Sequence, residues 1–455
     1  MKQFKSHTFN LWVALLSLTS LLFACNQKPK PTYAQDIAPI IFKNCITCHH
    51  PKGAGPFSLM RYHDVKKRAK MIAFVTSTGY MPPWPADKNY SHFINERSLT
   101  ENEIQLIQNW YRSGAEAGDT TNLKYPNIKS QSSILGMPDM IIDIPSVQIK
   151  NNNTDQFYTI KIPYEIPQNK YVKAVDFMPG QLKYVHHFNG HYLAFTKQTN
   201  PFDGIKILNL QDSLYAQSFE LLKLKNHDGT MPFRVHSAVN YLPGSFGVQY
   251  PNGIGGFELT QKGAFIANDI HYGPSRRTVN DSSKLYLYFS DEPPKRQTFE
   301  LMMGTNGVSK IEPPLLVPAG KITKHTTQLS IYNDISILTI NPHMHLIGSK
   351  FKAYAIKPNG DTIRLIHIPK WQFRWQYFYT FQNPVKIPKG SNIIVEAEFD
   401  NSSKNPNNPN KPPQDIGERL DYGGASMRTT DEMLQFIITY MPYQKGDEKI
   451  DLGGR

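Results

Sequence analysis

From about residue 130 to its end, the chain carries short runs of β-branched and aromatic residues, and these runs limit the folds it can adopt. Gly, Pro, Asn and Asp separate the runs at short intervals. This pattern is typical of antiparallel strands joined by turns, as in an all-β sandwich. The region is too long for one sandwich, so we predict two. Clear runs are MIIDIP (140–145), YVKAVDF (171–177), KLYLYF (284–289), ISILTI (335–340) and NIIVEAEF (392–399).

A motif of another kind, Cys45-x-x-Cys48-His49, lies nearer the N-terminus. In an exported protein this spacing indicates a covalent c-type haem, because two thiols can bond the haem vinyl groups and the adjacent histidine can ligate the iron. The trailing histidine and the lack of a βαβ pattern disfavour a thioredoxin-like thiol pair. A zinc site would need two further ligands nearby, for which His50 and His63 are the candidates.

Helical patterns flank this motif. Apolar residues at Ile37, Ile40 and Ile41 recur at helical spacing. Residues 100–114 begin with Thr100, carry a glutamate three positions later, and stop at a glycine. That arrangement is a capping box followed by a helix stop. We therefore predict a helix on each side of the motif.

The stretch that contains this motif and its two predicted helices resembles the small class I cytochromes c over roughly ninety residues, in which helices pack around a haem. The resemblance predicts a small all-α domain at residues 31–120. It also implies a sixth haem ligand, which in such domains is often a methionine on a Pro-rich loop. Met81 in MPPWP fits that place, and Met60 and Met71 are the alternatives.

The N-terminus is typical of an export signal. Lys2 and Lys5 precede an apolar run at residues 11–24 that is too short to span a bilayer comfortably. The run ends in Leu-Phe-Ala-Cys, which resembles a bacterial lipobox, and cleavage before Cys25 would leave a lipidated cysteine. We predict a lipoprotein-type signal peptide at residues 1–24, with ordinary cleavage as the alternative. The protein is then a periplasmic, outer-membrane or cell-surface lipoprotein of a bacterium, held at the membrane by lipid alone.

Formal net charge is +13, but the Lys and Arg residues are scattered along the chain. Nucleic-acid-binding domains concentrate basic residues on one face, so we predict no nucleic-acid partner. The three cysteines are assigned to lipid and haem, which leaves none for a disulfide. A polar stretch at residues 121–133 is predicted to link the haem domain to two β-rich domains, at residues 134–300 and 301–445.

His343 and His345 form the first notable histidine group of the β-rich region, in the sequence NPHMHLIG. A strand points residues i and i+2 to the same face. The pair can therefore bind one metal ion, with Met344 turned away.

His186 and His187 form a second group, in KYVHHFNGH. Adjacent residues point oppositely in a regular strand, so these two can share a metal only at a bulge, at a strand end, or through different ring nitrogens. His271, in ANDIHYG, would on its own be a hydrogen-bonded core histidine. Spacing alone predicts one or two histidine-rich metal sites on a β scaffold, and imidazole suits both zinc and copper.

The order HH, HY, HxH and EM along residues 130–445 resembles the copper type II ascorbate-dependent monooxygenases, the family of peptidylglycine α-hydroxylating monooxygenase and dopamine β-monooxygenase. The resemblance implies two jelly-roll-like antiparallel sandwiches, each with one copper ion, on opposite sides of a solvent-filled cleft. It also implies three histidines at the first copper, and two histidines with a methionine at the second copper, where O2 and substrate react. The residues that match are His186, His187 and His271 for the first and His343, His345 and Met433 for the second.

The sequence departs from the family at the substrate position. Peptide-hydroxylating members hold a substrate carboxylate with an arginine two residues before the HxH pair, and with an asparagine and a tyrosine after the methionine. Here those positions hold Asn341, Gln435 and Ile437. Without the arginine a buried carboxylate loses a bidentate pair, about 1.5–3 kcal/mol per bond. We therefore expect a substrate other than a glycine-extended peptide.

The resemblance implies hydroxylation of a C–H bond of a small substrate with O2, at the cost of two electrons that relatives take from ascorbate. We hypothesise that the fused haem domain relays these electrons from a reductant or redox protein. Two alternatives remain open. One is a non-catalytic lipoprotein that binds haem and copper for electron transfer or copper handling. The other is an extracellular β-sandwich binding module with an appended cytochrome.

Overall fold

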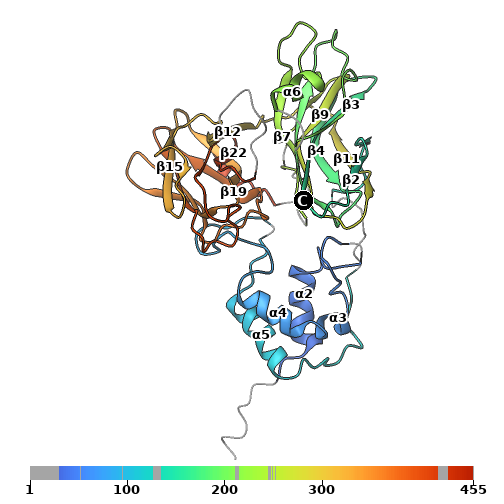
Figure 1. The fold of residues 1–455 in the computed structure, drawn as a ribbon, viewed down its shortest axis with the longest axis vertical. Coiled ribbons are helices and arrows are strands. Elements are labelled where there is room, and N and C mark those ends of the chain that lie inside the picture. The colour runs from blue at the N-terminus through green and yellow to red at the C-terminus, as the bar shows by residue number, and fades with distance from the viewer. Residues whose placement is uncertain are drawn as a thin grey trace, which may run out of the picture. The chain divides into compact units, whose positions relative to one another are not determined.

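The computed structural model describes residues 30–51, 53–94, 96–126, 135–210, 215–243, 247, 249–251, 253–418 and 429–453. The chain divides into two compact units (Figure 1), which we call the helical unit and the β-rich unit. The helical unit comprises Met1–Cys45, Leu59–Met81 and Leu99–Pro126, and the β-rich unit comprises Ile46–Ser58, Pro82–Ser98 and Asn127–Arg455.

The helical unit contains one π-helical turn and four short α-helices in its described part. Helix α5 begins where the capping box predicts, because the Thr100 side chain accepts a hydrogen bond from the backbone of Glu103 and the Glu103 carboxylate accepts one from the backbone of Thr100. The elements are η1 (Tyr33–Ile37), α2 (Ala38–Asn44), α3 (Tyr62–Lys66), α4 (Ala69–Ser77) and α5 (Glu101–Arg112).

Aromatic residues form the centre of the helical unit. Tyr33 and Trp110 are fully buried, and their ring centroids lie 6.3 Å apart. The indole Nε1 of Trp110 and the backbone N–H of Tyr33 both donate to the carbonyl of Glu116, each at 2.9 Å. These contacts confirm helices on both sides of the motif, while the likeness to cytochrome c stays a prediction.

The first sandwich of the β-rich unit packs a four-stranded sheet against a five-stranded sheet (Figure 1). All of its strand pairs are antiparallel. The sheets have the orders β1-β11-β4-β8 and β6-β3-β9-β5-β7. Their strands are β1 (Met140–Asp143), β3 (Gln156–Glu165), β4 (Lys170–Met178), β5 (Val185–Ala194), β6 (Ile207–Asn209), β7 (Phe233–Tyr241), β8 (Phe257–Leu259), β9 (Lys262–Tyr272) and β11 (Lys284–Ser290); β2 (Val147–Ile149) pairs with β10 (Val279–Asp281), and α6 (Tyr215–Leu221) follows β6.

Apolar side chains from the two sheets meet in one core. Phe177 on β4 and Phe188 on β5 are buried, and their rings stack across the core with centroids 4.4 Å apart. Strand β3 contributes alternate residues from Tyr158 to Tyr164 to this core, because side chains alternate between the faces of a sheet.

The second sandwich pairs sheets of the orders β12-β22-β16-β19 and β13-β15-β20-β17-β18. On β20, alternate residues from Ile393 to Phe399 are buried, and Phe351 packs against Phe436 with ring centroids 5.8 Å apart. Both sandwiches confirm that the chain is mainly β-sheet. The strands are β12 (Phe299–Gly304), β13 (Ile311–Glu312), β15 (Ile322–Ser330), β16 (Ile335–Met344), β17 (Gly348–Ile356), β18 (Thr362–Ile368), β19 (Tyr379–Ile387), β20 (Asn392–Asp400) and β22 (Leu434–Pro442), with β14 (Leu316–Val317) paired to β21 (Ile416–Gly417) and η2 (Asp447–Lys449) near the end.

Residues Pro82–Ser98 belong to the β-rich unit although they lie inside the segment predicted as the haem domain. Trp84 packs edge-on against Tyr379 with ring centroids 5.3 Å apart, and the backbone of Ile94 donates to Thr380 at 2.8 Å. The segment therefore covers part of the second sandwich. The predicted domain boundaries stay predictions.

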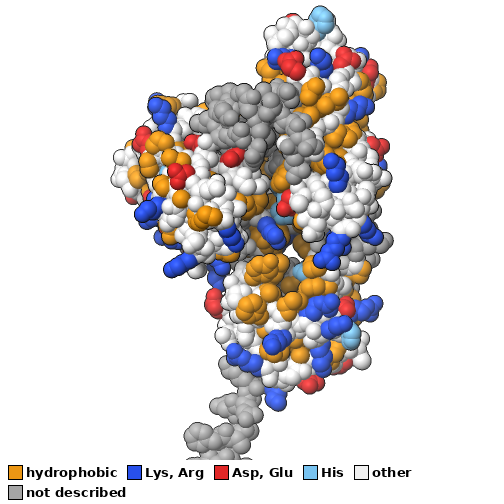
Figure 2. Space-filling model, viewed as in Figure 1, with side chains coloured by type: hydrophobic (Ala, Val, Ile, Leu, Met, Phe, Trp, Pro, Cys, Tyr) orange, Lys and Arg blue, Asp and Glu red, His pale blue; other side chains and the backbone are white. Residues whose placement is uncertain are grey.

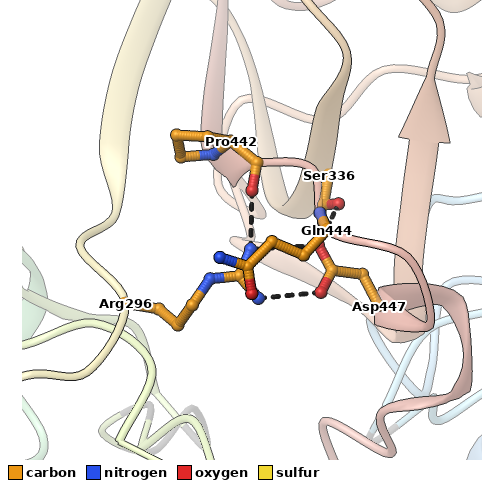
Figure 3. A network of polar contacts seen from close by, with 5 residues as sticks. All are labelled: Arg296, Ser336, Pro442, Gln444 and Asp447. Carbon is orange, nitrogen blue, oxygen red and sulfur yellow. Dashed lines mark hydrogen bonds and ion pairs between the residues drawn. The ribbon is translucent and has the colours of Figure 1, made fainter.

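A polar network holds the segment between β11 and β12, which links the first sandwich to the second (Figure 3). The guanidinium of Arg296 donates to both carboxylate oxygens of Asp447, at 2.8 and 3.1 Å, and to the carbonyl of Pro442 at 2.6 Å. The hydroxyl of Ser336 and the backbone of Gln444 also donate to Asp447. Burial raises the pKa of Asp447, but these donors outweigh it and hold the pKa below its ordinary value. The ionised carboxylate is thus the stabilised form.

We expect a Lys161→Met substitution to lower the free energy of unfolding by about 2–4 kcal/mol. Lys161 is 1% exposed, and its Nζ donates to the carbonyls of Asp203, Leu222 and Lys223 at 3.0, 2.8 and 3.0 Å. Methionine fills the space but leaves these carbonyls without that donor. Chemical denaturation measures the change, with Lys206→Met, on an exposed lysine, as the matched control.

The contribution of Lys161 should also depend on pH. Burial lowers its pKa to about 8 from an ordinary 10.5, so the native state releases the proton before the unfolded state does. Between these values the unfolded state binds more protons, and stability rises with pH. The wild type should therefore gain stability relative to Lys161→Met from pH 8 to 10.5. A constant difference over that range would contradict the argument.

Among the described residues, no helix combines the length and the apolar character needed to cross a membrane. Figure 2 shows Lys and Arg side chains distributed over the visible face, interspersed with Asp and Glu.

Candidate metal centres

Three predicted ligands meet on adjacent strands of the first sandwich. His186 and His187 lie at the start of β5, and His271 lies near the end of β9. The register places His187 opposite His271 and shifts between Val185 and His187. This irregularity lets two consecutive histidines approach the same neighbour. One ligand atom from each of the three histidines lies within 4.8 Å of the others.

The nitrogen atoms of this first cluster have a spacing that suits a metal ion. The Nδ1 atoms of His186 and His187 lie 3.4 Å apart. An ion at the 2.0–2.1 Å typical of imidazole ligands in a tetrahedral site holds its nitrogens about 3.3–3.4 Å apart. Burial, together with the charges of His271, His187 and Arg374, lowers the pKa of His186 to about 3. The ring is therefore neutral at physiological pH, the form that binds metal.

Asp155 fixes the orientation of the third histidine. The Nε2 atom of His271 lies 2.8 Å from Oδ1 of Asp155, and the ring of Phe157 stacks on the imidazole at 4.3 Å. The hydrogen bond from His271 holds the pKa of Asp155 below its ordinary value, against burial, so the carboxylate is an acceptor only. Nε2 then carries the proton, and the lone pair of the neutral ring is on Nδ1. A histidine bound to metal commonly donates its other nitrogen in this way.

The second predicted pair lies at the end of β16. His343 is within the strand and His345 follows its last residue, with ring centroids 5.1 Å apart. Met344 between them is fully buried in the core of the second sandwich. The alternation predicted from the HxH pattern is therefore present.

Two acceptors determine which nitrogens this pair presents. Nδ1 of His345 donates to the carbonyl of Asp431 at 3.0 Å, and Nδ1 of His343 donates to Oε1 of Gln376. The Gln376 amide has one orientation, because its Nε2 donates to the carbonyl of Phe373 at 2.8 Å. Both Nδ1 atoms therefore carry the protons, and both Nε2 atoms keep their lone pairs.

Met433 directly precedes strand β22, which pairs with strand β16. Strand β22 pairs with β16 so that Gln435 faces His343 and Leu434 faces Met344. Met433 comes directly before Leu434, and His345 comes directly after Met344. Met433 is 9% exposed. The observed pairing therefore ends one residue short of Met433, and its role as a ligand stays a prediction.

Glu432 connects the two predicted ligands. One carboxylate oxygen accepts the backbone N–H of His345 at 2.9 Å and that of Met433 at 3.2 Å, and the other accepts Ile347 at 2.8 Å. Burial raises the pKa of Glu432 to about 8, and these N–H groups act against that rise. Sequence reasoning gave no role to Glu432, Gln376 or Asp155. Of these three, only Glu432 belongs to a motif noted in the sequence, the EM motif.

Residues 298–449 match the family model described as copper type II ascorbate-dependent monooxygenase, C-terminal domain. The second sandwich is copper monooxygenase-like. The match contains His343, His345 and Met433, and it supports a copper-dependent, monooxygenase-like oxidoreductase function that uses O2, a substrate and a reductant. The first histidine cluster lies outside the matched residues.

Comparisons with solved structures and with curated proteins do not extend this likeness beyond the second sandwich. Alignments with solved structures include the infectious bursal disease virus VP2 subviral particle and the Gx strain of that virus, at 8% and 10% identity. Each covers 72% of this chain and 87% of that chain, with a TM-score of 0.15, which is too low to indicate a shared fold. A comparison with curated proteins gave no match.

The three positions at which the sequence departs from peptide-hydroxylating relatives all lie in the monooxygenase-like sandwich. The amide of Asn341 donates to the carbonyls of Gln376 and Tyr377, at 3.2 and 2.9 Å, and the amide of Gln435 donates to Thr305 at 2.8 Å. Ile437 is the strand partner of Asn341. Both amides are therefore engaged in holding backbone.

The predicted haem ligands fall on both sides of the unit division. Cys45 and Met81 belong to the helical unit, and Cys48 and His49 belong to the β-rich unit. Nδ1 of His49 donates to the carbonyl of Phe57 at 3.0 Å, which leaves Nε2 with its lone pair. Burial raises the pKa of the Cys48 thiol. The His49 ring suits an iron ligand, but haem attachment stays a prediction, and Cys25 lies outside the described residues.

Gly55 is needed where the chain turns around His49. A Cβ atom at this position would lie 2.7 Å from Nδ1 of His49 and 2.9 Å from the carbonyl oxygen of Cys48. The glycine thus allows the loop to hold the imidazole against Phe57.

Proposed function

We propose that this protein is a copper-dependent monooxygenase that inserts one oxygen atom of O2 into a C–H bond of a small organic substrate. The observation that carries the proposal is the family match over residues 298–449, which contains the pair His343 and His345 at one strand end, each with its Nδ1 donating to an acceptor. The reaction takes two electrons and two protons besides O2 and substrate, and yields the hydroxylated product and water.

His343, His345 and Met433 would hold the copper ion at which O2 reacts. Bound there, copper supplies O2 reduction beside the substrate, and two imidazoles with one thioether favour its Cu(I) state. Gln376 and the Asp431 carbonyl orient the two imidazoles. Glu432 binds the backbone N–H groups of His345 and Met433. The protein thus fixes the donor set before metal and substrate arrive.

The first cluster, formed by His186, His187 and His271, would hold the other copper ion and transfer electrons. Its donors are imidazoles alone, with Asp155 orienting His271. The difference in donor atoms between the clusters supports a difference in role, because ligand type sets the preferred oxidation state of copper.

A c-type haem on Cys45, Cys48 and His49 would deliver electrons singly from an external reductant or redox protein, with Met81 as the sixth ligand. The orientation of His49 by the Phe57 carbonyl supports this proposal. An exported lipoprotein anchored through Cys25 would meet such donors in the periplasm or at the cell surface.

The substrate would be a small molecule without a carboxylate to be held by arginine. At the three positions discussed above the chain has Asn341, Gln435 and Ile437, and the two amides already bind backbone carbonyls. An apolar or neutral substrate suits these three positions better than an anion does, because burying an anion without a partner is costly.

Metal analysis tests the proposal. Protein produced with haem maturation and loaded with copper should contain two coppers and one iron per chain. With a reductant and a substrate panel of neutral, apolar compounds, it should consume O2 and form hydroxylated products, and copper-free protein should not. Two coppers without O2 consumption on any compound would instead indicate copper handling, and protein without bound copper would refute both.

A further inference from the structure

Residues 371–377 form a segment that is fastened tightly beside the second histidine pair. The backbone N–H of Trp371 donates to Ser349 at 2.8 Å, and its indole Nε1 donates to the carbonyl of His345 at 3.2 Å. At the other end, the Asn341 amide binds the carbonyls of Gln376 and Tyr377. The segment is therefore held by residues of strands β16 and β17 and by His345, which follows β16.

Aromatic packing adds to this attachment. The ring of Phe373 stands edge-on to the imidazole of His345, with centroids 5.8 Å apart. Trp375 and Tyr377 are almost parallel, at 6.1 Å and 9°. Tyr377 is 5% exposed. Such packing restricts the rotamers of the side chains between these anchors.

Gln376 lies between these anchors, and its amide is fixed at both ends. Its Nε2 donates to the Phe373 carbonyl at 2.8 Å, so its Oε1 faces Nδ1 of His343. A neutral imidazole has one N–H and one lone pair, and the acceptor at Nδ1 determines that the lone pair is at Nε2.

The two histidines differ in how this orientation is achieved. His345 donates to a backbone carbonyl, that of Asp431, which no substitution removes. His343 donates to a side chain. Gln376 is thus a point at which the donor atom of this pair can be changed without touching a ligand.

We propose that Gln376 is a positioning residue of the second copper site, which selects Nε2 of His343 as the ligand atom and holds the ring in the coordinating orientation. The proposal rests on the proposed copper site. Outer partners of this type typically change metal affinity by about 10–100-fold when they are lost.

Three variants test the proposal. Gln376→Leu has a similar volume but no acceptor, and it should weaken copper binding at one of two sites by about 10–100-fold while leaving the other unchanged. Gln376→Glu keeps an acceptor within reach of His343 and should recover most of the affinity. Gln372→Leu makes the same change on the same segment, at a half-buried residue, and should behave as wild type.

Copper affinity is measured by competition with a chelator, and X-ray absorption of the Cu(I) protein reports the sulfur of Met433, which belongs to the second site alone. Gln376→Leu should lose the sulfur signal at limiting copper. If that variant does not fold when metal-free, Gln376→Asn, which withdraws the acceptor by one methylene, takes its place.

The outcomes separate the two proposals. A wild type that binds no copper through sulfur refutes the second copper site and, with it, the role of Gln376. A wild type with that signal, and a Gln376→Leu variant with the same affinity and the same signal, refutes the role of Gln376 alone.

Discussion

Replacing His343 by alanine should reduce the copper content from two ions to one per chain. The pair at the end of β16 would lose one of its two imidazoles, and a single imidazole with a thioether is a poor site for copper. Product formation should fall by about three orders of magnitude, because the ligands of a reaction centre act as a unit. The first cluster lies on other strands, so its copper should remain.

Copper analysis and product assay measure these changes, and His92→Ala is the matched control. The His92 side chain is 77% exposed and pairs with Glu96, so its removal should leave two coppers. A second variant, Met433→Leu, fills the same space without sulfur and should weaken Cu(I) binding more than Cu(II) binding. Two coppers and normal hydroxylation in His343→Ala would exclude this pair as the reaction site.

Replacing Glu432 by alanine should lower the free energy of unfolding by about 3–6 kcal/mol, from three buried N–H groups at about 1–3 kcal/mol each with partial relaxation. Glu432 is 1% exposed and accepts the backbone N–H groups of His345, Ile347 and Met433. The same loss releases the backbone of two predicted ligands, so copper binding at the second site should weaken as well.

Denaturant unfolding of metal-free protein measures the stability change, followed by copper titration of the folded variant. Glu432→Gln keeps one carbonyl oxygen and should have an intermediate effect. Glu448→Ala, at an exposed glutamate, should be neutral. A Glu432→Ala variant as stable as wild type would show that water or backbone shifts replace the carboxylate.

The local pattern of the sequence predicted much of the β structure. The runs at 335–340 and 392–399 became strands β16 and β20, and the capping box began helix α5 at its predicted place. These features depend on neighbours within a few residues, which share a face or a helical turn. The HxH spacing belongs to the same class, since its geometry follows from a single strand.

Strand partners could not be obtained in this way. Strand β16 lies between β19 and β22, and β22 begins about ninety residues after β16 ends. Likewise, the approach of His186 and His187 to His271 needs a register shift between β5 and β9. Pairing over such separations is chosen by the burial of whole faces rather than by any local motif.

The sequence by itself determined the residue types that can bind metal, the β character of most of the chain, and the one-sided presentation of His343 and His345. Only the tertiary structure decided which nitrogen His271, His343 and His345 offer. Asp155, Gln376 and Asp431 make that choice, and each lies at least thirty positions from the imidazole that it orients. The reason is physical: a tautomer is set by the acceptor in contact with the ring, and chain folding alone brings that acceptor to it.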